Sequence, residues 1–300
     1  MEKKNSKSNS IGLLPTKKAC RKCGFILTSY MHNDNHRYFH CPTCNLFTIW
    51  NYDTLLSCMR ISVSSLEILL HLFTENHAAT TAHQIINADF IGLSISLNTV
   101  ERYFRMFSQI ALNYYTESHN SILLEGEVEI DETQLYREKK SFAPGRPYEF
   151  SNVWIIGFKE RKTDRFLIFP TIKRTEAIFI PLLLSHVKLR STIYTDCFSV
   201  YVNNKKFLPE SKLQSLGYIH SFINHKISFV NQIFNNIHTN TIERLWRTLK
   251  EHTKKHKTKH LYLLCIGRFF FHKSLKKELQ LAYLVKQLNE KKLHIFDLEV

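Results

Sequence analysis

Apolar and acidic residues alternate through residues 126–136 of the chain, GEVEIDETQLY. Val128 and Ile130 take every second position, and Glu129 and Asp131 take the positions between and after them. A period of two in a run that contains β-branched residues predicts a strand with one acidic face. Because carboxylates in a row on one face repel one another, this face indicates a bound cation.

The pattern after this strand predicts a meander followed by alternating helices and strands. We expect strands at residues 153–159 and 165–172, a helix at 175–189, strands at 191–195 and 217–224, and a helix that Asn240 caps and that ends near residue 255. A helix or loop through Tyr201 should separate the last two strands. This order favours an α/β fold of the ribonuclease H-like class, in which helices flank a mixed sheet.

Helical periodicity also runs through residues 57–110, where 98–101, NTVE, fit a capping box. Two short helices joined by residues 87–97 would form a helix-turn-helix, whose second helix can enter a major groove. A plain helical connector is an equal alternative, because most helix pairs with such turns do not touch DNA. Residues 261–290 predict one or two further helices.

Four of the seven cysteines form two close pairs with the spacing C-x2-C-x17-C-x2-C. They are Cys20, Cys23, Cys41 and Cys44. Two such knuckles bring four thiolates to the corners of a tetrahedron, so the spacing predicts one structural Zn²⁺. Gly24 suits the tight turn of the first knuckle. Three histidines lie between the pairs, and the pattern leaves open that one of them replaces a cysteine ligand: His32, His36 and His40.

The charge balance favours a polyanionic partner. Lys and Arg number 41 against 26 acidic residues, a formal charge of +15, and such an excess suits the phosphates of nucleic acid. A basic protein without such a partner is the alternative. No apolar run approaches the roughly 18 residues of a membrane helix, so we expect no membrane partner. The opening, MEKKNSKSNS, lacks the apolar core of a secretory signal and predicts a disordered basic tail.

Two later acids complete the candidate chemistry of the acidic strand. Asp196 follows the strand expected at 191–195, and Glu243 lies one turn into the helix that begins at Asn240. With Asp131 they predict a pocket for two Mg²⁺ or Mn²⁺ ions, which serve phosphodiester chemistry by activating the attacking hydroxyl and stabilising the leaving oxygen. Each acid alone is more often a cap or a surface group, so the prediction depends on their joint placement.

Two neighbouring acids are alternatives to Asp131. Glu129 shares its strand face, whereas Glu132 should point to the other face of the sheet. The period of two does not choose between Glu129 and Asp131.

The helix that carries Glu243 has basic residues on the same face. Arg247 is four residues on and Lys250 seven, so both are expected to contact phosphate beside the metal site. Trp246 belongs to the apolar stripe of this helix and is expected in the core.

Several motifs together resemble one enzyme family. They are EIDET around Asp131, the Gly145-Arg146 pair, VWIIGFKERKTDRF, YTDCFSVY around Asp196, GYIHSFINH and HTNTIERLWRTLK. The chain from about residue 126 to 255 thereby resembles the Merlin superfamily of DDE transposases and their bacterial insertion-sequence relatives. A zinc ribbon before the catalytic domain is also typical of these proteins.

The resemblance implies that Asp131, Asp196 and Glu243 form the catalytic, metal-binding triad. The family's His and Asn-His positions fall on His220, Asn224 and His225, and its HTN motif falls on His238, Thr239 and Asn240. Of these, His238 and Asn240 are expected to contact DNA together with Arg146. The three histidines either orient metal ligands or contact phosphate, or form hydrogen bonds that fix loops. Residues 201–217 exceed the usual family length, which predicts an inserted surface loop.

The implied function is DNA transposition, with metal-dependent cleavage at terminal inverted repeats and strand transfer into target DNA. The enzyme would act as a homo-oligomer, at least a dimer on DNA, in the nucleus of a eukaryote or in the cytoplasm and nucleoid of a bacterium. The alternatives are a domesticated, catalytically silent zinc-ribbon DNA-binding protein and a ribonuclease H-type nuclease.

The predicted organisation has five parts. These are a basic tail at 1–16, the zinc ribbon at 17–52, a helical segment at 53–120 that is a candidate helix-turn-helix for DNA binding, the ribonuclease H-like catalytic domain at 121–258, and a helical extension at 259–300.

Overall fold

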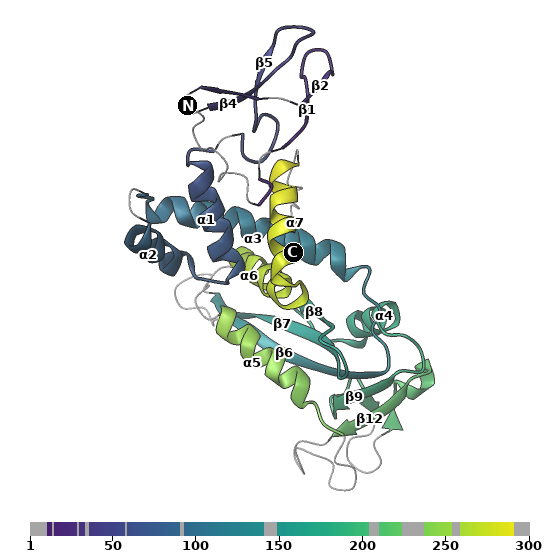
Figure 1. Ribbon diagram of the computed structural model, residues 1–300. Helices are drawn as coiled ribbons and strands as arrows, with labels where there is room; N and C mark the ends of the chain where they lie inside the picture. The colour runs from purple at the N-terminus through teal and green to yellow at the C-terminus, as the bar shows by residue number, and fades with distance from the viewer. Residues whose placement is uncertain are drawn as a thin grey trace. The chain divides into compact units, whose positions relative to one another are not determined.

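The computed structural model describes residues 11–13, 15–28, 30–33, 36–57, 59–90, 93–140, 149–203, 210–223, 237–253 and 259–290 (Figure 1). The chain divides into two compact units, one of residues 1–114 with 270–300 and one of residues 115–269. The five-part organisation drawn from the sequence stays a prediction at its finer boundaries.

The first unit begins with the cysteine-rich module. Its strands are β1 (Lys18–Ala19), β2 (Ile26–Leu27), β3 (Tyr30–Asn33), β4 (His36–His40) and β5 (Phe47–Ile49). β1 pairs with β2, and β3, β4 and β5 form a separate antiparallel sheet. Each cysteine pair thus lies in a turn next to a short strand, as expected for a zinc ribbon.

Helices make up the rest of the first unit. They are α1 (Val63–Thr74), α2 (Ala79–Asp89), the larger part of α3 (Leu97–His119), the end of α6 (Lys259–Ser274), and α7 (Lys277–Asn289). The apolar stripe predicted for α1 is buried, with Leu66, Leu69, Leu70 and Phe73 all at 0% exposure. The sequence prediction of further helices at 261–290 is confirmed by α6 and α7.

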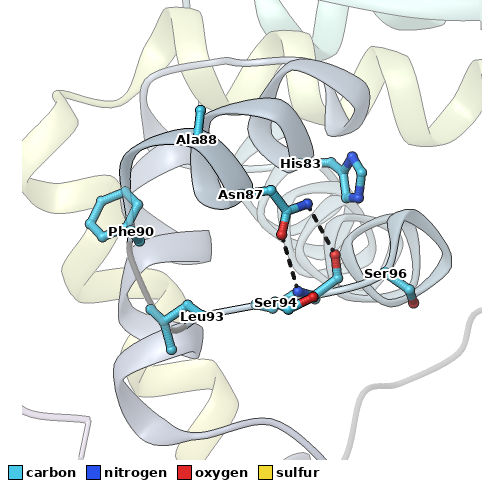
Figure 2. A pocket seen from close by; sticks show the side chains of 8 residues that line it. His83, Asn87, Ala88, Phe90, Leu93, Ser94 and Ser96 are labelled. Atoms are coloured by element: carbon cyan, nitrogen blue, oxygen red, sulfur yellow. Dashed lines mark hydrogen bonds between the residues drawn. The ribbon is translucent and has the colours of Figure 1, made fainter.

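The connection between α2 and α3 departs from its prediction only in the residue that caps α3. The side chain of Asn87 bonds to both the backbone N–H and the carbonyl of Ile95, at 3.4 Å each, and so fixes the turn (Figure 2). Ser96, and not Asn98, caps α3, since its Oγ accepts the N–H of Thr99 at 3.3 Å. The capping-box prediction was wrong because a serine two residues earlier supplies the same acceptor. α3 then continues for 23 residues, so the second helix of the pair is long.

A five-stranded sheet forms the centre of the second unit. Its strands are β6 (Glu127–Lys140), β7 (Glu149–Glu160), β8 (Phe166–Thr171), β9 (Thr192–Asp196) and β12 (Ile219–Ile223), in the order β12-β9-β6-β7-β8. β12, β9 and β6 run parallel, whereas β7 and β8 are antiparallel to their neighbours. With the flanking helices, this mixed sheet confirms the α/β class predicted from the sequence.

Helices cover the two faces of this sheet. α4 (Glu176–His186) buries Phe179 and Leu183 in the same cluster as Ile130 and Phe158. α5 (Asn240–Thr253) lies along β6 and β7 on the other face (Figure 1). A Cβ atom on Gly157 of β7 would lie 2.1 Å from the Trp246 ring of α5, so the missing side chain permits the close approach of this helix.

The segment between β9 and β12 begins with turns through Tyr201, which agrees with the loop that was one of the two expectations there. In its described part it also contains a short hairpin of β10 (Val202–Asn203) and β11 (Glu210–Ser211) and the 3₁₀ turn η1 (Gln214–Leu216), which the sequence did not predict. Of the helices that the structure describes, none combines the length and the apolar character needed to cross a bilayer.

Candidate functional site

The sheet register brings two of the predicted acids together. Glu129 of β6 stands opposite Tyr194 of the parallel strand β9. Two residues further along each strand lie Asp131 and Asp196, and β9 ends at Asp196. The two carboxylates therefore meet at the carboxyl-terminal edge of β9, where parallel strands commonly place ligand-binding groups.

α5 adds the third acid to the same place. Asp131, Asp196 and Glu243 all line one open cavity of about 460 Å³. The other residues that line it are Glu132, Thr133, Trp246, Arg247 and Lys250. The cavity thus holds four carboxylates with two exposed basic side chains at its side.

Each of the three predicted acids accepts a hydrogen bond, that of Asp131 from another element and those of Asp196 and Glu243 from nearby residues in the chain. Trp246 donates its Nε1–H to Asp131 Oδ2 at 2.9 Å. The backbone N–H of Phe198 donates to Asp196 Oδ1 at 2.9 Å. Glu243 Oε1 accepts the Thr239 hydroxyl at 3.1 Å. The carboxylates are thereby oriented before any ligand arrives.

Burial and mutual repulsion favour protons or cations in this cavity. Burial, together with the charges of Asp196 and Glu243, raises the pKa of Asp131 to about 6, although the Trp246 hydrogen bond opposes the shift. Burial and the charges of Asp196 and Asp131 raise the pKa of Glu132 to about 8, against the effect of Arg174. A divalent cation would relieve the same repulsion.

Glu132 partly departs from its prediction. It stands on the other strand face, as expected, and accepts a hydrogen bond from the buried hydroxyl of Tyr201. It nevertheless lines the same cavity as Asp131, because both lie beside the end of β9. Glu132 is therefore a fourth carboxylate of the site and does not exclude Asp131.

Glu129 is fully buried and does not line this cavity. Its Oε2 accepts the backbone N–H groups of Thr241 and Ile242 at 2.9 Å each, in the first turn of α5. Its Oε1 accepts the Thr241 hydroxyl at 2.8 Å and Arg161 Nε at 2.9 Å. The carboxylate thus fixes the N-terminus of α5, where the helix dipole favours negative charge.

Arg161 extends this network to other strands. Its guanidinium carbon lies 3.5 Å from the ring centre of Tyr194 in β9, and the Tyr194 hydroxyl donates to Glu127 of β6 at 2.9 Å. Arg161 also donates to the carbonyl oxygen of His238, just before α5. The network connects β6, β9 and the residues before α5, and so sets where α5 presents Glu243.

The remaining predicted residues lie in different surroundings. His238 lies against Glu129, with 3.3 Å between its Nδ1 and Oε1, and is absent from the cavity lining. Asn240 is the exposed first residue of α5, and Thr239 occupies the cap position that was predicted for Asn240. Arg146, Asn224 and His225 lie outside the described residues.

His220 fixes the hairpin that follows Asp196. Its Nε2 bonds Thr195 Oγ1 at 2.9 Å and its Nδ1 bonds Ser211 Oγ at 2.7 Å. Burial lowers the pKa of His220 to about 4, so the ring is neutral near pH 7. Its position favours the loop-fixing alternative over a phosphate contact.

The four paired cysteines fit a single zinc ion. All four Sγ atoms lie within 4.8 Å of one another, and the Cys20–Cys44 and Cys23–Cys41 distances are each 3.5 Å. Tetrahedral zinc with Zn–S bonds of about 2.3 Å separates its sulfurs by about 3.8 Å.

The two knuckles share one backbone geometry. Gly24 N donates to the Cys20 carbonyl and Asn45 N to the Cys41 carbonyl, each at 2.9 Å, and both donors have positive φ. The turn predicted at Gly24 is thereby confirmed. Asn45 adopts the same conformation in the second knuckle, because asparagine tolerates it better than most residues. His40 bonds the Asn45 side chain at 2.6 Å, and the described cluster consists of cysteines alone.

The carboxylates also suit hard cations by their chemistry. Mg²⁺ and Mn²⁺ prefer oxygen ligands, and the cavity offers four carboxyl groups. Among the described residues, the cysteines are the one group of three or more possible ligands within 4.8 Å of one another. Carboxylates that bind a pair of ions can lie further apart than 4.8 Å, because two carboxylates that each contact a different ion need not contact each other.

The fold and the site define an α/β domain with an acidic cavity at the edge of its sheet, flanked by basic side chains. Residues 123–263 match the family model described as ISXO2-like transposase domain. This part of the chain is therefore a DDE transposase domain of the insertion-sequence type, which confirms the resemblance seen in the sequence. A comparison with curated proteins found no match to the chain.

Two features of the site escaped prediction from the sequence. Arg161 lies in the quoted motif VWIIGFKERKTDRF, but periodicity gives no reason to pair it with Glu129 across 32 residues. The bond from Trp246 to Asp131 was also missed, because the apolar stripe placed this residue correctly in the core without showing where its N–H points. The general rule that a buried Trp N–H needs an acceptor was the available signal.

Proposed function

We propose that this protein cleaves DNA at terminal inverted repeats and joins the cut ends to target DNA, using divalent metal ions held by Asp131, Asp196 and Glu243. One observation carries the proposal: these acids, far apart in sequence, line one cavity with Arg247 and Lys250 in a transposase-type domain. A surface of this kind suits a reaction centre that must attract cations and phosphates together.

Each residue has a distinct task in this proposal. Asp131, held by Trp246, would contribute to both metal sites, while Asp196 and Glu243 would each complete one. Bound Mg²⁺ or Mn²⁺ would lower the pKa of the attacking water or 3′-hydroxyl and neutralise charge on the leaving oxygen. Arg247 and Lys250 are exposed on α5 and would hold the phosphates of the reacting strand.

DNA recognition would involve further parts of the chain. We assign this task to the zinc ribbon, with Zn²⁺ on its four cysteines, and to the helices α2 and α3. Arg146, His238 and Asn240 are proposed as additional DNA contacts. Transposition requires the two ends of the mobile DNA to be held together, so the active form would be at least a dimer on DNA. It would act in whichever compartment contains that DNA.

A strand-transfer assay tests the proposal. The substrate carries the inverted repeats that flank the gene, and product is measured with Mg²⁺ and with Mn²⁺. Asp196→Asn and Glu243→Gln should each lower product at least 100-fold, because a lost metal ligand removes a charge that the reaction needs. Glu251→Gln is the matched control, an exposed acid on the same helix outside the cavity. Equal product from wild type and Asp196→Asn would refute the assignment.

A further inference from the structure

The side chain of Arg174 lies between two aromatic rings. Its guanidinium carbon is 3.6 Å from the ring centre of Trp154 and 4.8 Å from that of Phe198. Stacking on ring faces fixes the plane of a guanidinium and uses none of its N–H donors. Among the residues that the structure describes, none forms a hydrogen bond or a close ion pair with Arg174.

These two rings lie beside the acidic cavity. Trp154 of β7 pairs with Gln134, three residues beyond Asp131 on β6. Phe198 follows Asp196 by two residues, and its N–H holds the Asp196 carboxylate.

Arg174 and the basic residues of α5 flank the cavity from different faces of the sheet. Trp154 has the strand parity of Ile156 and Phe158, whose side chains pack with α4. Arg247 and Lys250 belong to α5, on the opposite face. A strand of nucleic acid that crosses the edge would therefore meet a basic group on each side of the four carboxylates.

We propose that Arg174 binds a phosphate of the DNA strand that enters the cavity, on the α4 side of the sheet, one or more nucleotides from the phosphates held by Arg247 and Lys250. The proposal rests on the function proposed above. The four carboxylates repel phosphate, so the strand needs basic anchors on both sides of them. A guanidinium already held by two rings loses little conformational entropy when it forms a bidentate phosphate contact.

A purely structural role is the competing explanation, in which the stacked side chain only ties residues 172–175 to β7. DNA binding distinguishes the two roles. The probe is a fluorescein-labelled duplex of mixed sequence, titrated with the zinc-bound full-length chain without added Mg²⁺ or Mn²⁺, between about 50 and 200 mM KCl. Fluorescence anisotropy gives the slope of log K against log salt, and melting temperatures are measured in parallel.

One lost phosphate contact should lower the steepness of this slope by about 0.9. For Arg174→Gln, the ratio of wild-type to variant affinity should then be roughly three-fold larger at the lowest salt than at the highest. Arg174→Lys keeps the charge and should restore most of the slope while binding more weakly than wild type. Lys173→Gln removes the same charge from the neighbouring exposed residue and should change the slope less.

An unchanged slope in Arg174→Gln, with or without a lower melting temperature, would overturn the proposal. So would an equal change in Lys173→Gln, because the effect would then be one of general charge. The assay contains no added Mg²⁺ or Mn²⁺ and no strand transfer. A wild-type chain that binds DNA without forming product would therefore count against the proposed function and leave the result for Arg174 standing.

Discussion

The buried carboxylate of Glu129 offers the sharpest test of how α5 is positioned. Its two oxygens accept four hydrogen bonds. Three come from α5, from the backbone N–H groups of Thr241 and Ile242 and the Thr241 hydroxyl, and the fourth comes from Arg161. Glu129→Gln keeps the size and shape of the side chain but replaces one acceptor oxygen by an NH₂ donor. Whichever way the amide turns, two donors face each other.

The expected cost follows from these partners. If the amide nitrogen faces α5, the N–H groups of Thr241 and Ile242 lose their acceptor, at about 1–3 kcal/mol each. In either orientation Arg161, with 11% side-chain exposure, loses the charge of its partner Glu129. Removing one member of a buried ion pair typically costs about 3–5 kcal/mol. Both orientations therefore predict a loss of at least about 3 kcal/mol in unfolding free energy.

Urea unfolding of the full chain, followed by tryptophan fluorescence, measures this loss. Glu125→Gln is the matched control, because Glu125 pairs with Lys188 at 2.9 Å while both side chains are more than half exposed. Such a surface pair contributes about 0–1 kcal/mol. A loss below about 1 kcal/mol in Glu129→Gln, equal to the control, would show that the carboxylate does not hold α5 and would refute the reasoning.

Three further predictions address other parts of the chain. Gly157→Ala places a methyl group 2.1 Å from the Trp246 ring and should cost about 1–3 kcal/mol and shift the Trp246 fluorescence; an unchanged urea midpoint and emission spectrum would contradict the packing. The pKa of His220 is about 4 in the folded chain against 6.5 for the unfolded one. The unfolded state therefore takes up the proton first, so the unfolding free energy should fall as pH drops from 6.5 to 4. In His220→Gln, urea unfolding at a series of pH values should show a smaller fall over this range. Parallel pH curves for wild type and variant would exclude His220 as the cause of the pH dependence. Cys41→Ser should remove zinc, measured by mass spectrometry of the purified protein, whereas Cys265→Ser, at a buried cysteine outside the cluster, should retain it; equal zinc content in both would contradict the four-cysteine site.

Much of the fold follows from local sequence patterns. Three patterns predicted elements that the structure contains: the alternation in β6, the meander that follows it, and the apolar stripe of α5. Each pattern reflects a face that packs on the core. The spacing of the cysteines predicted the cluster of four possible zinc ligands, because the short knuckles constrain their own geometry. The segment after Asp196 was less predictable, because its hairpin depends on His220 and Ser211 and not on periodicity.

The distinction between Glu129 and Asp131 shows why the site needed the structure. Both acids share one face of β6, so the period of two treats them alike. The difference comes from the neighbouring strand: β9 runs beside Glu129 but ends at Asp196, level with Asp131. Glu129 is therefore enclosed by α5 and its buried partners, while Asp131 faces the open cavity. Where one strand stops thus decides which carboxylate holds the helix and which one is available to a cation.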